Sequence, residues 1–392
     1  MREVYVVGAV RTAIGTFGGS LKDVPLSDLA TTVIRAAINQ CNIPVEQIGH
    51  VVMGNVIPTE PRDAYLSRVA SLNAGIPKEV PALNVNRLCG SGLQAIVSAA
   101  QSILLADCEV SIGAGAESMS RGPYISGSQR WGARMGNSES VDYTLGILND
   151  PFEHTHMGVT AENVAARYAI TREMQDDLAL TSHRRAANAI AKGYFASQIT
   201  PIELKTRKGT TLFDTDEHVR GDTTLEGLAR LKPAFKKDGI VTAGNSSGIN
   251  DGAAALVLAS AAAVRSLNLK PLARLVAYAH AGVEPAYMGM GPVPATLLAL
   301  KRAGLQVQDL DVVESNEAFA AQACAVIGEL GLDAEKVNPN GSGISLGHPV
   351  GATGAIIATK AIYEMHRTGS RYALTTMCIG GGQGIAAIFE RS

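Results

Sequence analysis

The sequence predicts a layered α/β fold, in which helices pack closely on the faces of β-sheets. The 392 residues include 41 glycines and only 5% aromatic side chains, while 46% are apolar. Such a composition suits close packing of helices on sheets, and the length suits two or three domains. Strand-like and helix-like stretches also alternate along the chain. In order, these are a strand at 4–7, a helix at 28–41, strands at 51–53 and 82–88, a helix at 93–106 and a strand at 110–112.

A weak internal repeat indicates that the fold contains two similar halves. Residues 37–48 match residues 299–310 in their apolar pattern, and residues 51–55 match 312–316 after a one-residue slip. A strand, a glycine turn and a helix occur around residue 89 and again around 347–360. Any two α/β units look alike, which is the plainer interpretation. The matching order and offset favour a duplication.

The segment at 120–243 interrupts the alternation. It combines mixed loops, helical stretches at 160–170 and 171–195, and a charged stretch at 205–222. We therefore expect one half at 1–119 and 244–268, an inserted loop domain at 120–243, and a second half at 269–392. Loops on a rigid scaffold commonly carry the substrate contacts.

Charge and cysteine content limit the partners and the compartment. The net charge is −2 without long runs of one sign, so neither nucleic acid nor an anionic membrane is expected as a partner. The N-terminus does not have the pattern of a signal peptide, and the sequence contains no apolar run long enough to span a membrane. The five cysteines (Cys41, Cys89, Cys108, Cys324 and Cys378) are odd in number and form no CxxC motif, which favours a reducing compartment. These features predict a cytoplasmic protein.

Cys89 is the first candidate for chemistry. It stands between a predicted strand and a predicted helix, within Leu88-Cys89-Gly90-Ser91-Gly92. The helix dipole is expected to lower the pKa of a thiol at this position, and amide groups of a glycine turn can hold an oxyanion. A single cysteine is also commonly a small buried core residue. The local pattern leaves both interpretations open.

Cys378 also lies where an apolar strand runs into a glycine-rich turn, which ends at Gly384. Glycines at this density suit a turn where a ligand or another backbone passes closely. A phosphate-binding loop is the competing idea, but the turn lacks the lysine and hydroxyl residue of a P-loop and the spacing of a dinucleotide fingerprint.

His348 and Asn316 are the other candidates. His348 lies between glycine and proline, where an imidazole can serve as a general base near neutral pH. Asn316 follows a predicted strand at the expected start of a helix, where it could either cap the helix or donate to a substrate oxygen. The remaining histidines stand in ordinary contexts, with His156 a partial exception. The sequence contains no metal-binding motif, so no metal is expected.

Together these segments resemble the thiolase family. NRLCGSGLQAI, ESNEAFAAQ, GHPVGATGA and CIGGGQG match its hallmark stretches in order and spacing, and RTAIGTFGG and TAGNSSGINDGAAA match as well. The resemblance covers essentially the whole chain and is closest to acetyl-CoA acetyltransferases and β-ketothiolases. It implies a five-layered fold of two βαβαβαββ halves with an inserted loop domain. It also implies a homotetramer, built as a dimer of dimers.

The resemblance implies a role for each reactive residue. Cys89 takes the acyl group from acyl-CoA, and His348 accepts the proton of Cys89. Cys378 moves a proton to or from the α-carbon of the second acetyl-CoA. Asn316 holds a water that, with His348, stabilises the enolate oxygen. The backbone N–H groups of Cys89 and Gly380 form a second oxyanion hole. The substrates are acetyl-CoA, short acyl-CoA and 3-oxoacyl-CoA, and no cofactor is needed because CoA is itself substrate and product.

Further positions match the family's CoA-binding pocket: Ser247, Arg220, Leu148, His156, Met157, Phe235, Ala318, Phe319 and Met288. Two residues depart from the family pattern, because Ser246 and Ser315 stand where alanine is usual. Neither removes a reactive group. The acyl chain length, the physiological direction and the pathway stay open.

Two rival functions are considered. A β-ketoacyl synthase of the same superfamily uses a carrier protein and has histidine or asparagine where this chain has Cys378. A non-catalytic acyl-CoA-binding protein would have no need for two cysteines and a histidine in these motifs. Both rivals fit the sequence less well than a thiolase.

Overall fold

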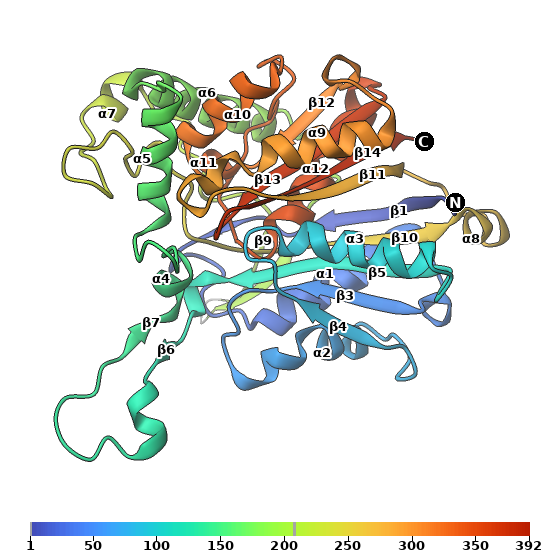
Figure 1. Cartoon of the computed structure of the whole chain (residues 1–392). Helices are drawn as coiled ribbons and strands as arrows, with labels where there is room; N and C mark the ends of the chain where they lie inside the picture. The colour runs from blue at the N-terminus through green and yellow to red at the C-terminus, as the bar shows by residue number, and fades with distance from the viewer. Residues whose placement is uncertain (1, 207–208) are drawn as a thin grey trace.

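The computed structural model describes residues 2–206 and 209–392 and is built on a large mixed sheet (Figure 1). Nine strands form its main path, and β2 (Gly15–Thr16) pairs with β10 beside it. The order across the sheet is β12 (Val312–Ser315), β13 (Tyr372–Ile379), β14 (Gln383–Arg391), β11 (Ala273–Gly282), β1 (Val4–Arg11), β10 (Asn250–Ser260), β5 (Val110–Ser118), β3 (His50–Gly54) and β4 (Ala82–Val85).

The two sides of the sheet repeat one topology. β1 and β11 meet through only two residue pairs at the centre. Outward from β1 come β10, β5 and β3, and outward from β11 come β14, β13 and β12. On both sides the first two pairings are antiparallel and the third is parallel. This correspondence confirms the predicted duplication.

The repeated sequence stretches fold alike. α1 (Leu26–Cys41) and α9 (Pro292–Ala303) are each followed by a single 3-10 turn, at Val45–Gln47 and Val307–Asp309. Each turn leads into a strand, β3 or β12, that lies parallel to its neighbour. The apolar pattern detected at 37–48 and 299–310 therefore marks the same structural unit in both halves.

Helices and sheet form five layers. α3 (Ser91–Leu104) and α12 (Thr353–Thr368) contact each other and strands of both halves, so they form the central layer (Figure 1). α1 and α2 (Leu66–Asn73) cover the outer face of the first half, and α9 covers that of the second. Separate apolar clusters fill the spaces between these layers. The predicted layered α/β fold is thus confirmed.

The predicted elements differ from the structure mainly at their ends. The strand expected at 82–88 ends at Val85, and the helix expected at 93–106 runs from Ser91 to Leu104. The strand expected at 110–112 continues to Ser118. The chain leaves β4 early because it turns sharply before Cys89, at a residue with positive φ.

The segment between β5 and β10 carries small elements and a projecting arm. The arm, residues 122–142, contains the short paired strands β6 (Tyr124–Ile125) and β7 (Val141–Asp142) and extends away from the body (Figure 1). The main helices that follow are α4 (Tyr143–Ile147), α5 (Met157–Arg167), α6 (Arg172–Ala191) and α7 (Leu225–Ala229), with the hairpin β8 (Ile202–Thr206) and β9 (Gly209–Phe213). The remaining helices are α8 (Ala261–Ser266), α10 (Ala320–Leu330) and α11 (Gly343–Leu346).

A buried ion pair joins this segment to the first half. Arg11 on β1 donates to both carboxylate oxygens of Asp216, at 2.8 and 2.9 Å, and both side chains are fully buried. Two charges without access to water are stable only with such complete pairing. The pair therefore fixes the residues just after 216, which line the cavity described below. Among the described residues, no helix is long and apolar enough to cross a membrane.

Candidate active site

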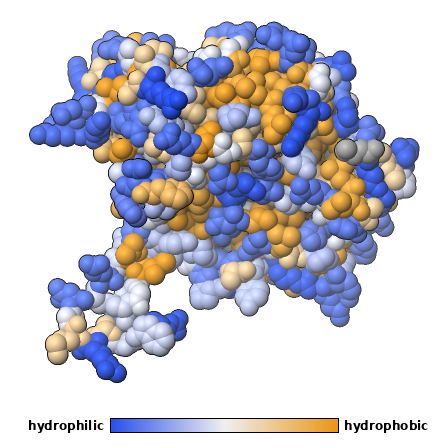
Figure 2. Space-filling model, in the orientation of Figure 1, coloured by the Kyte–Doolittle hydropathy of each residue, from blue (hydrophilic) through white to orange (hydrophobic). Residues whose placement is uncertain are grey.

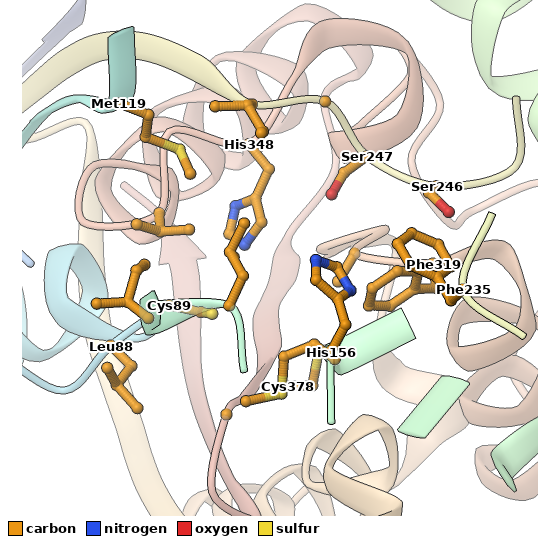
Figure 3. Close-up of a pocket in the computed structure, with 18 of the residues that line it drawn as sticks. Leu88, Cys89, Met119, His156, Phe235, Ser246, Ser247, Phe319, His348 and Cys378 are labelled. Carbon is orange, nitrogen blue, oxygen red and sulfur yellow. The ribbon is translucent and has the colours of Figure 1, made fainter. Parts of the chain in front are cut away.

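A cavity of about 440 Å³ collects side chains from both halves and from the segment between them. Its wall includes Cys89, Leu148, His156, Met157, Arg220, Phe235, Ser247, Met288, Ala318, Phe319, His348, Cys378 and Gly380. These are the site residues named from the sequence, apart from Asn316, which contacts His348. Figure 3 shows Cys89, His348 and Cys378 converging on one space from different elements.

Cys89 lies on a tight elbow directly before helix α3. Leu88 has a φ of +48°, a left-handed conformation that is uncommon for a residue with a side chain. The hydroxyl of Ser91 closes the elbow by donating to the carbonyl of Leu88 at 2.7 Å. A Cβ on Gly90 would lie 2.6 Å from the end of the Ile379 side chain, so a larger residue here would displace that side chain. The elbow presents the thiol to the cavity.

The electrostatic surroundings of Cys89 differ from the sequence-based expectation. Burial raises the pKa of the thiol, and the negative charge of Glu117 raises it further. The backbone N–H groups of Gly380 and of Cys89 itself act in the opposite direction, because both point at the sulfur. Burial outweighs them, so the predicted lowering of this pKa is wrong. The thiol rests protonated and requires a base to become a nucleophile.

His348 is held so that its cavity-facing nitrogen can be that base. Its Nδ1 lies 2.6 Å from the hydroxyl of Thr353, which itself donates to the carbonyl of Pro349 at 2.9 Å. The hydroxyl therefore accepts from Nδ1–H, and Nε2 is left unprotonated. Burial lowers the imidazole pKa to about 4, which keeps the ring neutral. The backbone amide of His348 donates to Asn250 at 2.9 Å.

Asn316 lies beside His348 rather than at a helix end. Its Nδ2 is 3.4 Å from Nε2 of His348, and its backbone amide donates to the carbonyl of Thr376. Helix α10 starts at Ala320 with Phe319 as its N-cap, so the helix-capping interpretation of Asn316 is wrong. Within the described part of the chain, its Oδ1 is buried without a hydrogen-bond partner. A buried amide in this state is suited to bind a small polar group.

Cys378 approaches the cavity near the end of β13. Its side chain is only 1% exposed, and burial raises its pKa, with a further increase from neighbouring Cys89. The backbone around Gly291 packs directly against the glycine-rich turn that follows Cys378, because a Cβ on Gly384 would overlap with Gly291. The same turn places Gly380 N–H against the sulfur of Cys89.

Aromatic and methionine side chains form a wall of the cavity that includes Cys378. His156 stacks on Phe235 with ring centroids 4.6 Å apart, and Phe235 meets Phe319 edge to face at 5.9 Å (Figure 3). Met157 and Met288 are buried in the same apolar cluster. The space beside the two thiols is therefore lined by apolar side chains, which suits an acyl chain.

The other predicted pocket residues lie on loops that are tied to this wall. The amide of Ser247 donates to the carbonyl of Ala318 at 3.0 Å, and the carbonyl of Leu148 accepts from the amide of Met157 at 2.8 Å. The amide of Arg220 donates to the ring of His183. These contacts hold loops from different segments around the cavity.

Sequence reasoning missed part of the site. His218 lines the cavity, although it was grouped with the ordinary histidines. It follows Asp216 and Glu217, which contact residues on or just after β1, but no motif identifies it. Apolar lining residues were also missed: Val56, Met119, Ile249 and Val350. Three of them adjoin the ends of β3, β5 and β10, where topology rather than local pattern places them.

The two departures from the family pattern lie close to the site. The hydroxyl of Ser246, which lines the cavity, donates to the carbonyl of Thr242 at 2.7 Å. The hydroxyl of Ser315 is buried and has no hydrogen-bond partner among the described residues. Neither displaces a reactive side chain. Across residues 2–206 and 209–392, no group of three or more His, Cys, Asp or Glu could hold a metal ion.

Comparisons with known proteins agree with this site. The family model for the thiolase N-terminal domain matches residues 4–262, and that for the thiolase C-terminal domain matches residues 269–391. The beta-ketothiolase BktB of Cupriavidus necator is 64% identical over 391 residues, covering 100% of this chain and 99% of that protein. An acetyl-CoA acetyltransferase of Pseudomonas aeruginosa is 48% identical, with both chains covered completely.

Solved structures give the same result. The human mitochondrial 3-ketoacyl-CoA thiolase superposes with a TM-score of 0.98 at 46% identity, covering 100% of this chain and 99% of that one. The Bacillus anthracis acetyl-CoA acetyltransferase also has a TM-score of 0.98, at 47% identity and with the same coverage. With both family models matched and full-length relatives this similar, the chain belongs to the thiolase family.

Proposed function

We propose that this thiolase catalyses the reversible Claisen condensation of acetyl-CoA with acetyl-CoA or another short acyl-CoA, giving 3-oxoacyl-CoA and CoA. The observation that carries the proposal is the convergence of two thiols and one neutral imidazole on a single apolar cavity. Relatives named beta-ketothiolase and acetyl-CoA acetyltransferase support it. A synthase acting on a carrier protein would have no use for the second thiol.

In the first half-reaction, Cys89 takes the acyl group. Neutral His348 accepts the thiol proton at Nε2 and keeps it as the sulfur attacks the thioester carbonyl and the bond to CoA breaks. The departing CoA thiolate takes its proton from Cys378, which becomes a thiolate. The N–H groups of Cys89 and Gly380 are aimed at the sulfur and so lie where the carbonyl oxygen of the adduct develops charge. The product is an acyl group on Cys89.

In the second half-reaction, Cys378 forms an enolate and Asn316 helps to stabilise it. The Cys378 thiolate takes a proton from the α-carbon of the second acetyl-CoA and is again a thiol. The resulting carbanion attacks the acyl carbonyl on Cys89, and the sulfur of Cys89 leaves and regains its proton from Nε2 of His348. A water held by Asn316, together with the Nε2–H that His348 gained in the first half-reaction, stabilises the enolate oxygen. The buried, unpaired Oδ1 of Asn316 supports this assignment. CoA enters as substrate and leaves as product, so these steps use only groups of the chain and of its substrates.

The predicted CoA contacts extend this proposal toward the cavity mouth. Ser247 and Arg220 line the cavity, and we assign them to the carrier arm of the entering thioester. The aromatic wall of His156, Phe235 and Phe319 would pack along that arm. The structure of the human mitochondrial 3-ketoacyl-CoA thiolase in complex with CoA, which superposes on this chain with a TM-score of 0.96, supports this assignment.

The decisive experiment is a comparison of thiolysis rates on acetoacetyl-CoA, 3-oxovaleryl-CoA and longer 3-oxoacyl-CoA substrates. The enolate absorbance of each substrate reports its loss. We expect the four- and five-carbon substrates to be cleaved and the rate to fall with length, because Met157 and Met288 narrow the cavity. Equal rates on long chains would contradict the size limit, and inactivity on every substrate would overturn the proposed function.

A pH profile tests the neutral imidazole. Because the pKa of His348 is lowered to about 4, the ring stays unprotonated above that value, whereas an ordinary imidazole titrates near 6.5. The rate of acylation, followed as the rapid release of CoA, should therefore hold down to about pH 5 and fall only toward pH 4. Circular dichroism at each pH controls for unfolding. A half-maximal rate between about pH 6 and 7 would show that the base is not held in this state.

The assembly is proposed as a homotetramer, a dimer of dimers, located in the cytoplasm. Figure 2 shows the projecting arm standing clear of the body. Within this arm Trp131 is 86% exposed and Met135 is 97% exposed. Apolar side chains this exposed are typical of a contact surface. Light scattering should give the mass of four chains, and replacing Trp131 and Met135 by serine should reduce it. A monomer in the wild type would contradict the assembly.

The proposed location in the cytoplasm rests on the cysteines. Each of the five cysteines is free, which supports a reducing compartment.

A further inference from the structure

Glu117 is a buried carboxylate that the proposed mechanism does not use. It lies on β5 and is fully buried. Burial raises its pKa to about 8, whereas the backbone amides that point at it lower the pKa. Its four hydrogen-bond partners are all donors, and this geometry matches the ionised carboxylate. Burying a carboxylate costs free energy of folding unless hydrogen bonds compensate for the lost water, and a buried acid of this kind is a candidate for a functional role.

Four donors surround the carboxylate of Glu117. Its Oε1 accepts from Nδ2 of Asn55 at 2.8 Å and from the amide of Ile57 at 3.0 Å. Its Oε2 accepts from the amides of Val56 at 3.1 Å and Gly351 at 2.8 Å. The donors belong to two different turns: Asn55, Val56 and Ile57 lie after β3, and Gly351 lies just before α12. Because every partner is a donor, only a group with two acceptor oxygens satisfies all of them.

Both turns reach the reactive cavity. The turn that contacts Glu117 through Gly351 begins at His348. At that first residue the backbone amide of His348 donates to Asn250, so both ends of the turn are fixed. Val56 and Val350 line the cavity and belong to the apolar cluster against which Cys89 packs. A Cβ at Gly351 would overlap with the Glu117 carboxylate, so the backbone at this position packs directly against the carboxylate and leaves no room for a side chain.

We propose that Glu117 is a positioning residue for the thiolase reaction. Its carboxylate holds the turn that carries His348 against the turn at residues 55–57, and so fixes the imidazole relative to Cys89. The inference rests on the proposed function, because it assigns Glu117 a purpose through the base role of His348. Misplacing a catalytic group by about 1 Å can cost on the order of 100-fold in rate.

The test is the variant Glu117→Gln. An amide has one acceptor oxygen, which can stay with Asn55 and Ile57, while its NH2 group then faces the donors of Val56 and Gly351 and releases the His348 turn. We expect kcat to fall by about 10- to 100-fold. KM should change less than about threefold, because Ser247 and Arg220 lie on other segments. The matched control is Glu364→Gln, since Glu364 is also a buried carboxylate but contacts Asn340 and Arg367 outside the cavity. It should keep kcat within about twofold of the wild type.

A double-variant cycle separates positioning from a general structural role. In a His348→Asn background, Glu117→Gln should reduce the residual rate by less than about threefold, because two residues that act through one group are not additive. A full additional loss in that background would overturn the proposal. Unchanged kcat in Glu117→Gln alone would also overturn it.

A second variant approaches the same contact from the other side. Gly351→Ala leaves Glu117 in place but pushes the turn away from it, and it should reproduce the loss of kcat with little change in KM. If neither variant folds by circular dichroism, the role is structural and the proposal fails. Activity of the wild type is measured first. An inactive wild type would defeat the proposed function, whereas an active wild type with an unaffected Glu117→Gln variant would defeat this inference alone.

Discussion

Replacing Cys89 by alanine should reduce turnover by a factor on the order of 10⁶, comparable with the loss of the nucleophile in other acyl-transfer enzymes. The thiol is the group placed on the elbow before α3, with two backbone N–H groups pointing at its sulfur. Without it, no acyl group can be held for the second substrate. The variant should show neither thiolysis of acetoacetyl-CoA nor a rapid release of CoA from acetyl-CoA.

The control for this variant is Cys41→Ala. Cys41 is also a free, half-buried cysteine, but it lies at the end of α1 and its thiol donates to helix carbonyls. Its replacement should leave turnover unchanged within about twofold. Substantial thiolysis by Cys89→Ala would show that the acyl group is carried elsewhere.

Replacing Cys378 by alanine should divide the reaction into its two halves. Cys378 is buried and its pKa is raised, so it rests as a thiol that can protonate an enolate. The thiolate so formed can take the proton of incoming CoA, which returns the site to its starting state. Without this thiol, overall turnover should fall by about 10² to 10⁴, the usual contribution of a general acid or base. Acylation of Cys89 by acetyl-CoA should persist, because the attack uses His348 and the departing CoA thiolate can take a proton from water instead.

The two half-reactions can be measured on one sample of Cys378→Ala. Rapid CoA release from acetyl-CoA reports acylation, and loss of the enolate absorbance of acetoacetyl-CoA reports the complete cycle. Overall turnover equal to that of the wild type would contradict the assignment and favour a synthase. Loss of acylation as well would show that Cys378 acts on Cys89 rather than on the second substrate.

Much of the fold could be predicted because its signals are local. The helix expected at 28–41 corresponds to α1 (Leu26–Cys41), and the repeat between 37–48 and 299–310 marks the same unit in both halves. Apolar periodicity and glycine turns are set by neighbouring residues, so they are visible in the sequence. The ends of β4 and α3 were misplaced because Leu88 adopts a left-handed conformation that only the folded elbow explains.

The site was predictable only in part. The local pattern around Cys89 is compatible with a nucleophile and with a buried core residue. Only the family resemblance grouped Cys89 with His348 and Cys378. The pKa of Cys89 was predicted in the wrong direction, because burial is a tertiary property that outweighs the helix terminus. His218 and Glu117 carry no motif, and their importance depends on contacts between segments distant in sequence.

The most direct test of the central claim is peptide mass spectrometry of the protein after brief incubation with acetyl-CoA. The mechanism predicts an acetyl group on the peptide that contains Cys89 and none on the peptide that contains Cys378. The Cys378→Ala variant should accumulate this adduct, since it lacks the group needed for the next step. Acetylation of Cys378, or turnover without any acetylated Cys89, would contradict the account.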